Sequence, residues 1–85
     1  MAQKILVVDD EANIRDLAAL YLEKEGFSVE TAVDGRDALA RFSQVQPALV
    51  ILDLMMPGID GFEVCRELRR DYTVPILMLT ARNDD

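Results

Sequence analysis

Histidine and tryptophan are absent from this 85-residue chain, and cysteine occurs only once, as Cys65. Without histidine, the chain has no imidazole for acid–base catalysis and no His-ligated zinc site. A single thiol excludes an internal disulfide and a cluster of thiolate ligands. Because Cys65 falls at an apolar position of a helical pattern, we interpret it as core packing rather than as a nucleophile.

Basic residues are also scarce: nine Lys and Arg stand against sixteen Asp and Glu, which gives a net charge of −7. That charge repels nucleic acid and anionic membranes. No stretch approaches the roughly 20 apolar residues of a membrane span, and the N-terminus lacks the pattern of a signal peptide. We therefore expect a soluble cytoplasmic protein that binds no nucleic acid and no membrane. Its length accommodates one domain, residues 1–85.

Two short apolar runs end directly in carboxylates. Residues 5–8 are followed by Asp9 and Asp10, and residues 48–52 by Asp53. Uninterrupted runs of this length with β-branched residues are typical of buried parallel strands. Pro and Gly at positions 57 and 58 then predict that the chain leaves the sheet after the second run.

Helical patterns begin at Glu11, Asp34 and Asp60 and separate these runs from two further strands, 28–31 and 75–79. The alternation predicts a parallel α/β sheet of strand order 2-1-3-4 with helices on both faces. Arg15 is expected on the polar face of the first helix. The expected buried positions are Ile14, Leu17, Ala18, Tyr21 and Leu22 in the first helix, Ala38, Leu39 and Phe42 in the second, and Gly61, Val64, Cys65 and Leu68 in the third.

This strand order would place Asp9, Asp10 and Asp53 at one crevice, where the first and third strands end side by side. Like charges about 4 Å apart repel by about 4 kcal/mol at an effective dielectric constant of 20, so the cluster favours a bound cation or protonation. Carboxylates without His or Cys suit magnesium, manganese or calcium rather than zinc. A carboxylate beside such a metal can itself attack a phosphoryl group. The simpler alternative is that Asp9 and Asp10 cap the first helix and Asp53 caps a turn.

Two small residues follow the fourth strand. The hydroxyl of Thr80 has the chemistry to donate a hydrogen bond to a phosphoryl oxygen, although a plain β-branched strand end is an equally open interpretation. The small side chain of Ala81 would leave the crevice open to a phosphoryl donor.

Three blocks, residues 7–11 (VVDDE), 52–61 (LDLMMPGIDG) and 79–81 (LTA), resemble the receiver domain of two-component response regulators. The resemblance covers the whole chain and implies a flavodoxin-like fold. It also implies a phosphoryl-accepting switch that is not a turnover enzyme, with a sensor histidine kinase as donor and an output domain elsewhere in the parent protein.

The resemblance implies a role for each matching residue. Asp53 would accept the phosphoryl group, Asp10 would bind Mg²⁺ (or Mn²⁺) directly, and Asp9 would bind it through a water. The backbone carbonyl of Met55 would complete the protein's share of the metal shell. Thr80 would be the hydroxyl that turns toward the phosphoryl group.

Members of this family continue after the Thr-Ala pair with a helix, a strand and a last helix, including a lysine that contacts the phosphoryl group. The sequence therefore resembles a receiver truncated after its fourth strand, and we expect impaired phosphorylation. The fourth strand would become an exposed edge, which predicts a homodimer or higher self-association through it.

Other functions stay open at this point. The chain could be an engineered or proteolytic fragment that acts only as a self-associating module. An aspartate-based phosphatase needs a second Asp two residues after the nucleophile, where this chain has Met55. A flavin carrier needs a phosphate-binding loop rich in Gly and hydroxyl groups after the first strand, where this chain has three acidic residues, 9–11.

Overall fold

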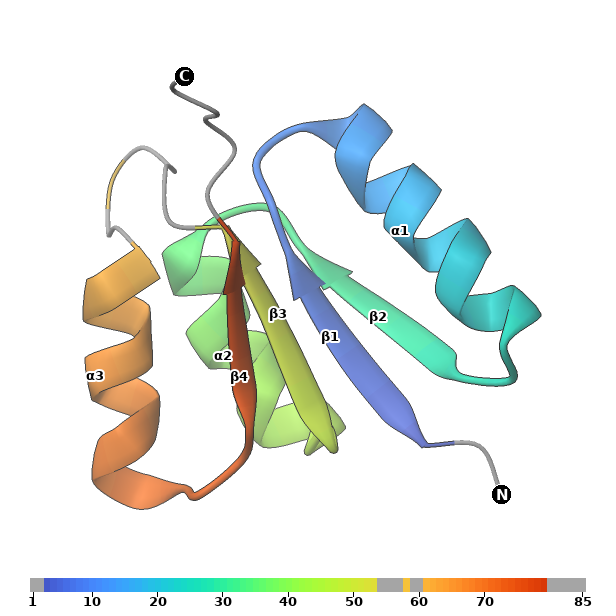
Figure 1. Ribbon diagram of the computed structural model, residues 1–85. Coiled ribbons are helices and arrows are strands. Elements are labelled where there is room, and N and C mark those ends of the chain that lie inside the picture. Colours follow the sequence, from blue (N-terminus) through green and yellow to red (C-terminus); the bar gives the residue numbers. More distant parts are fainter. Residues whose placement is uncertain (1–2, 54–57, 59–60, 80–85) are drawn as a thin grey trace.

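The computed structural model describes residues 3–53, 58 and 61–79. In this part of the chain, four parallel strands form one sheet in the order β2-β1-β3-β4 (Figure 1). The alternating α/β architecture and its predicted strand order are confirmed. The elements are β1 (Lys4–Val8), α1 (Ala12–Lys24), β2 (Ser28–Ala32), α2 (Gly35–Val45), β3 (Leu49–Asp53), α3 (Gly61–Asp71) and β4 (Ile76–Leu79).

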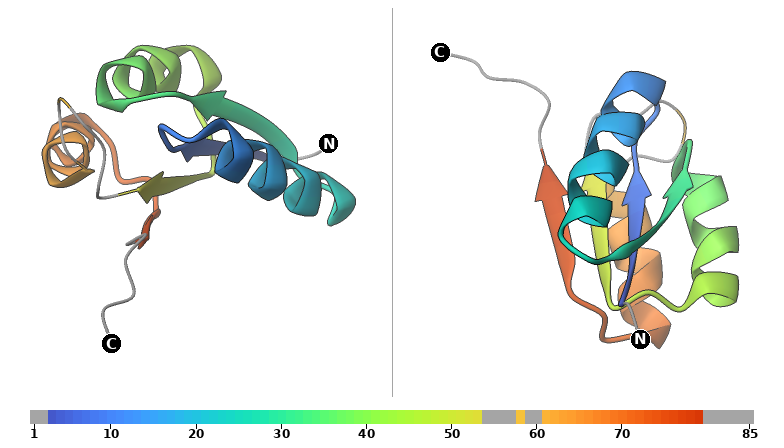
Figure 2. Two further views of the ribbon diagram at one scale, coloured as in Figure 1. Left: turned by 90° about the horizontal axis from the view of Figure 1, so that it is seen from above. Right: turned by 90° about the vertical axis from the view of Figure 1, so that its right-hand side faces the viewer.

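The helices lie on both faces of the sheet, as predicted. Seen from above, α2 and α3 cover one face and α1 lies on the other (Figure 2). Alternate strand residues point to opposite faces, so Leu6 and Val8 of β1 share a face with Val50 and Leu52 of β3. This face carries the main core, which is completed by Ala32, Ala38, Phe42, Val64 and Leu68.

Capping interactions set the start of α2 and the end of α1. The N–H of Asp37 donates to Oδ1 of Asp34, 2.9 Å away, so Asp34 caps α2 as predicted. After α1, Gly26 has φ +99°, which favours glycine, and the N–H of Phe27 donates to the carbonyl of Leu22 at 3.0 Å. The predicted helix end at Gly26 is thereby confirmed.

The buried stripe predicted for α1 is wrong in part. Ile14 and Leu17 are exposed, and Tyr21 is 64% exposed, while Ala18 and Leu22 are half-buried. The helix contacts β1 and β2, where it covers Ile5 and Val7. An amphipathic pattern shows which side of a helix is apolar, but not how much of that side another element covers.

No helix in the described ranges combines the length and apolar character needed to cross a membrane.

Candidate functional site

Three carboxylates converge where β1 and β3 end. These strands pair in parallel with Val8 opposite Leu52, so Asp9 and Asp53 come next to each other at the same edge of the sheet. One carboxylate oxygen from each of Asp9, Asp10 and Asp53 lies within 4.8 Å of the others. The predicted convergence of the three acidic residues is confirmed.

The three acids differ in their access to solvent. Asp9 and Asp53 are 8% and 5% exposed, whereas Asp10 is exposed. Burial raises the pKa of Asp9, and the negative charges of Asp53, Asp10 and Glu11 raise it further. The hydrogen bond from the Glu11 amide lowers that pKa and opposes these effects only in part.

The environment of Asp9 is set by hydrogen bonds on three sides. Its N–H donates to the carbonyl of Ala32 at 3.2 Å, and its Oδ1 accepts from the N–H of Glu11 at 2.9 Å. Nη1 of Arg15 donates to the backbone carbonyl of Asp9 at 2.7 Å. These bonds fix both the backbone and the carboxylate of Asp9 at the crevice.

Arg15 is a residue that the sequence reasoning did not connect to the site. The sequence pattern places it on the polar face of the first helix, whereas the structure shows it half-buried and reaching back to the loop before α1. Its position one turn into the helix that follows the acidic pair was the available signal. Periodicity alone does not show that a long polar side chain folds back along its own helix.

Helix capping does not account for the cluster. Glu11 occupies the N-cap position of α1 and makes no side-chain cap bond. The Asp9 carboxylate accepts from the amide of that N-cap residue, ahead of the first helical turn. Asp53 is the last residue of β3 and pairs with Leu79 of β4.

The donor set fits a hard divalent cation. At 4.8 Å, two unit negative charges repel by about 3.5 kcal/mol with an effective dielectric constant near 20. A cation between the carboxylates would attract each of them and so offset that repulsion. Carboxylate oxygens are the ligands of Mg²⁺, Mn²⁺ and Ca²⁺, and the exposure of Asp10 leaves one side of the cluster open to water or a phosphoryl group.

Three residues predicted for this site, Met55, Thr80 and Ala81, lie outside the described residues.

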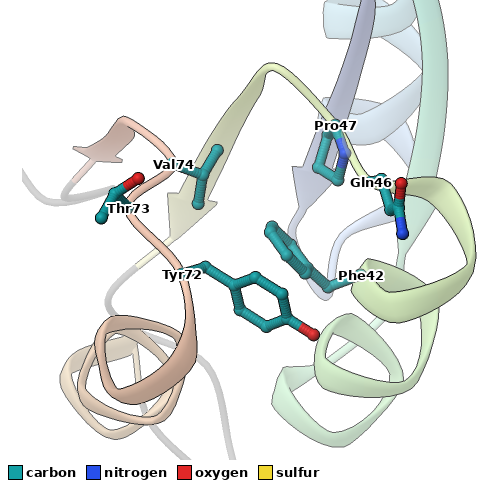
Figure 3. A pocket seen from close by; sticks show the side chains of 6 residues that line it. All are labelled: Phe42, Gln46, Pro47, Tyr72, Thr73 and Val74. Carbon is teal, nitrogen blue, oxygen red and sulfur yellow. The ribbon is translucent and has the colours of Figure 1, made fainter.

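A separate pocket of about 370 Å³ lies at the other end of the sheet (Figure 3). It sits where α2 and α3 end and the strands β3 and β4 begin, away from the acidic cluster. The rings of Phe42 and Tyr72 contact each other in it, with centroids 4.4 Å apart and planes tilted by 51°. Its lining residues are Phe42, Gln46, Pro47, Tyr72, Thr73 and Val74.

A parallel sheet of order 2-1-3-4 with three acids at its switch point defines a class of α/β proteins that bind ligands at the ends of their strands. The model of the response regulator receiver domain family matches residues 5–85. The chain therefore belongs to the response regulator receiver family.

Solved structures agree in fold and in sequence. Vibrio cholerae chemotaxis protein CheY4 is 38% identical, with a TM-score of 0.92 over 99% of this chain and 72% of that chain. Thermotoga maritima response regulator TrrA in complex with Mg²⁺–BeF is 46% identical, with a TM-score of 0.90 over 95% of this chain and 71% of that one. TrrA in complex with the histidine kinase ThkA matches with 46% identity and a TM-score of 0.89, over 96% of this chain and 72% of that one.

Proposed function

We propose that this chain is a cytoplasmic phosphoryl-accepting switch, phosphorylated on Asp53 in a Mg²⁺-dependent reaction with a sensor histidine kinase. The observation that carries this proposal is the position of Asp53, nearly buried at the end of β3 and within 4.8 Å of Asp9 and Asp10. The complex of the relative TrrA with a histidine kinase supports the choice of a sensor histidine kinase as the phosphoryl donor. The phosphorylated form would signal to an output domain of the parent protein.

The transfer needs one nucleophile and no acid–base residue. A carboxylate oxygen of Asp53 attacks the phosphorus of the donor's phosphohistidine, forming an O–P bond as the P–N bond breaks. The donor's ring carries a proton on its other nitrogen, so it leaves as neutral imidazole with the electron pair of the broken bond, and the product is an acyl phosphate on Asp53. This is one transfer per phosphorylation event, so the chain acts as a switch and not as a turnover enzyme.

The remaining acids would hold the metal. Asp10, the exposed member, would bind Mg²⁺ or Mn²⁺ directly, and Asp9 would bind it through a water. When bound, the metal supplies positive charge that offsets the charge on the carboxylates and the incoming phosphoryl group. The backbone carbonyl of Met55 would be a further ligand, as in the family pattern.

Two residues after β4 complete the proposal. The Thr80 hydroxyl would hydrogen-bond a phosphoryl oxygen and so report phosphorylation. Ala81, with its small side chain, would keep the approach to Asp53 open.

Phosphorylation by a small donor tests the acceptor. The protein is incubated with acetyl phosphate, with and without Mg²⁺, and the adduct is located by peptide mass spectrometry. We expect one phosphoryl group on Asp53, dependent on Mg²⁺ and absent from Asp53→Asn. Asp71→Asn, at the exposed end of α3, is the matched control and should be labelled like the wild type. A Mg²⁺-dependent adduct that persists in Asp53→Asn would disprove the assignment.

A second candidate function is self-association, and β4 is the observation that favours it. In the described sheet, β4 has a paired strand, β3, on one side only, and Leu77 of β4 is half exposed. Met78 and Leu79 are exposed as well, and no charged residue interrupts the strand. An edge of this kind offers backbone groups and apolar surface to another strand. A two-fold axis would pair two copies of β4 antiparallel.

Sedimentation velocity over a range of concentrations tests this second candidate. We expect a concentration-dependent dimer. Leu77→Lys should weaken it, because the lysine charge would have to be buried at the interface between the two copies of β4. Leu20→Lys places the same charge on an exposed residue of α1 and should leave the dimer intact. A wild-type protein that stays monomeric at high concentration would rule out the dimer.

A further inference from the structure

Arg15 joins the first turn of α1 to the acidic loop that precedes it. Its backbone N–H donates to the carbonyl of Glu11 at 3.1 Å, as in an ordinary helical turn. Its guanidinium turns back, and Nη1 donates to the backbone carbonyl of Asp9 at 2.7 Å. A hydrogen bond from a charged donor is stronger than one between neutral groups, and this one has the short distance typical of such bonds.

The carbonyl that accepts this bond belongs to the peptide group between two of the three clustered acids. A peptide group is planar, so fixing the direction of the Asp9 carbonyl also fixes the direction of the Asp10 N–H. The other side of Asp9 is tied to β2 through its N–H and the carbonyl of Ala32. Arg15 therefore holds the segment from which the exposed Asp10 side chain projects.

We propose that Arg15 is a positioning residue for the metal site, which orients the Asp9–Asp10 peptide so that both carboxylates face one cation together. This inference rests on the proposed function and adds to it a residue that is not itself a ligand. The observation behind it is the bond from Arg15 to the Asp9 carbonyl together with the two other bonds that anchor Asp9.

The positive charge of Arg15 has an effect of opposite sign, which makes the proposal testable. A cationic side chain near the cluster repels Mg²⁺, so its removal would tighten binding if charge were its main influence. If Arg15 acts by positioning, its removal weakens binding. We expect positioning to dominate, because the guanidinium is only half-buried and salt screens its charge, whereas the bond to the carbonyl is local.

Mg²⁺ alone is titrated into the full chain by calorimetry, at a temperature where each variant is shown to be folded. For Arg15→Gln we expect the Kd for Mg²⁺ to rise about tenfold, the scale of one charged hydrogen bond. Arg15→Lys keeps the charge but lacks the planar guanidinium, so its Kd should fall between those of Arg15→Gln and the wild type. Arg70→Gln removes the same charge from the far end of α3 and should leave the Kd unchanged.

A second measurement is made without metal. Hydrogen exchange at the Glu11 amide, which donates to the Asp9 carboxylate, should be faster in Arg15→Gln than in the wild type and unchanged in Arg70→Gln. A merely structural role would lower the melting temperature but leave the Kd of the folded protein unchanged.

The outcomes separate the two proposals. If the wild type does not bind Mg²⁺, the proposed function fails. If the wild type binds Mg²⁺ and Arg15→Gln binds it equally or more tightly, the positioning role alone is overturned. Should Arg15→Gln not fold, Arg15→Lys decides the question, and a Kd equal to that of the wild type overturns the proposal.

Discussion

Asp9 and Asp53 lie next to each other at the ends of β1 and β3, both nearly buried, with carboxylate oxygens within 4.8 Å. They come from positions 44 residues apart in sequence, and the parallel pairing of two strands brings them together. Because both are acidic and removed from water, the metal-free protein carries unfavourable charge at this point. The first two predictions follow from that relationship.

Without metal, Asp9→Asn should stabilise the protein at neutral pH, by roughly 1–3 kcal/mol from relieved repulsion. Asn keeps an oxygen that can accept the bond from the Glu11 amide. Urea denaturation with a chelator present measures the change. Asp16→Asn, an exposed residue of α1, is the control and should change stability little. A destabilised Asp9→Asn would contradict this account.

The same relationship predicts how stability depends on pH. The pKa of Asp9 is raised in the folded protein above its ordinary value of 3.8, so the folded state binds more protons than the unfolded state between those two pKa values. The contribution of Asp9 is therefore fully present at low pH and is lost as pH rises through this window. Metal-free denaturation from pH 4 to 7 should show a smaller fall in stability for Asp9→Asn than for the wild type. Equal pH profiles would refute the raised pKa.

Binding of Mg²⁺ should stabilise the wild type against heat. At a Mg²⁺ concentration one hundred times Kd, the free energy of unfolding rises by about 2.7 kcal/mol, because the ion binds only the folded state. Asp10→Asn removes the proposed direct ligand and should abolish most of this gain, while Asp16→Asn should retain it. Thermal melts with and without Mg²⁺ give the result. An undiminished gain in Asp10→Asn would place the ion elsewhere.

In the core, Leu52→Ala should lower the free energy of unfolding by about 2–5 kcal/mol. Leu52 is fully buried on the face covered by α2 and α3, one residue before Asp53, so its loss leaves a cavity next to the acceptor strand. Leu20→Ala removes the same atoms from an exposed site on α1 and should change stability by no more than about 0.5 kcal/mol. Urea denaturation compares the two variants, and similar costs for both would contradict the observed burial.

Asp34→Ala should destabilise the protein by about 1 kcal/mol, because the Asp37 amide at the start of α2 loses its side-chain acceptor. Asp34→Asn keeps an acceptor oxygen and should cost less. Chemical denaturation of both variants checks the difference. Equal costs would mean that the charge of Asp34, rather than its hydrogen bond, is what matters.

Much of the fold was predictable because local patterns carry it. Runs without polar residues at 5–8 and 48–52 predicted β1 and β3, and Asp34 and Gly26 predicted two helix ends through capping chemistry. The exposure of Ile14, Leu17 and Tyr21 was not predictable. Burial depends on which elements cover a face, and the chain's own periodicity does not contain that information.

For the site, the sequence by itself determined that Asp9, Asp10 and Asp53 follow strand-like runs and that hard oxygen ligands dominate the available chemistry. The alternation of strands and helices also predicted that β1 and β3 are neighbours. Only the tertiary structure decided how close the three carboxylates come, within 4.8 Å, and that Asp9 and Asp53 are nearly buried while Asp10 is exposed. It also decided that Arg15 turns back onto the Asp9 carbonyl. The physical reason is that side-chain direction and burial are set by long-range packing, whereas residue type, local spacing and the alternation of strands and helices are properties of the sequence.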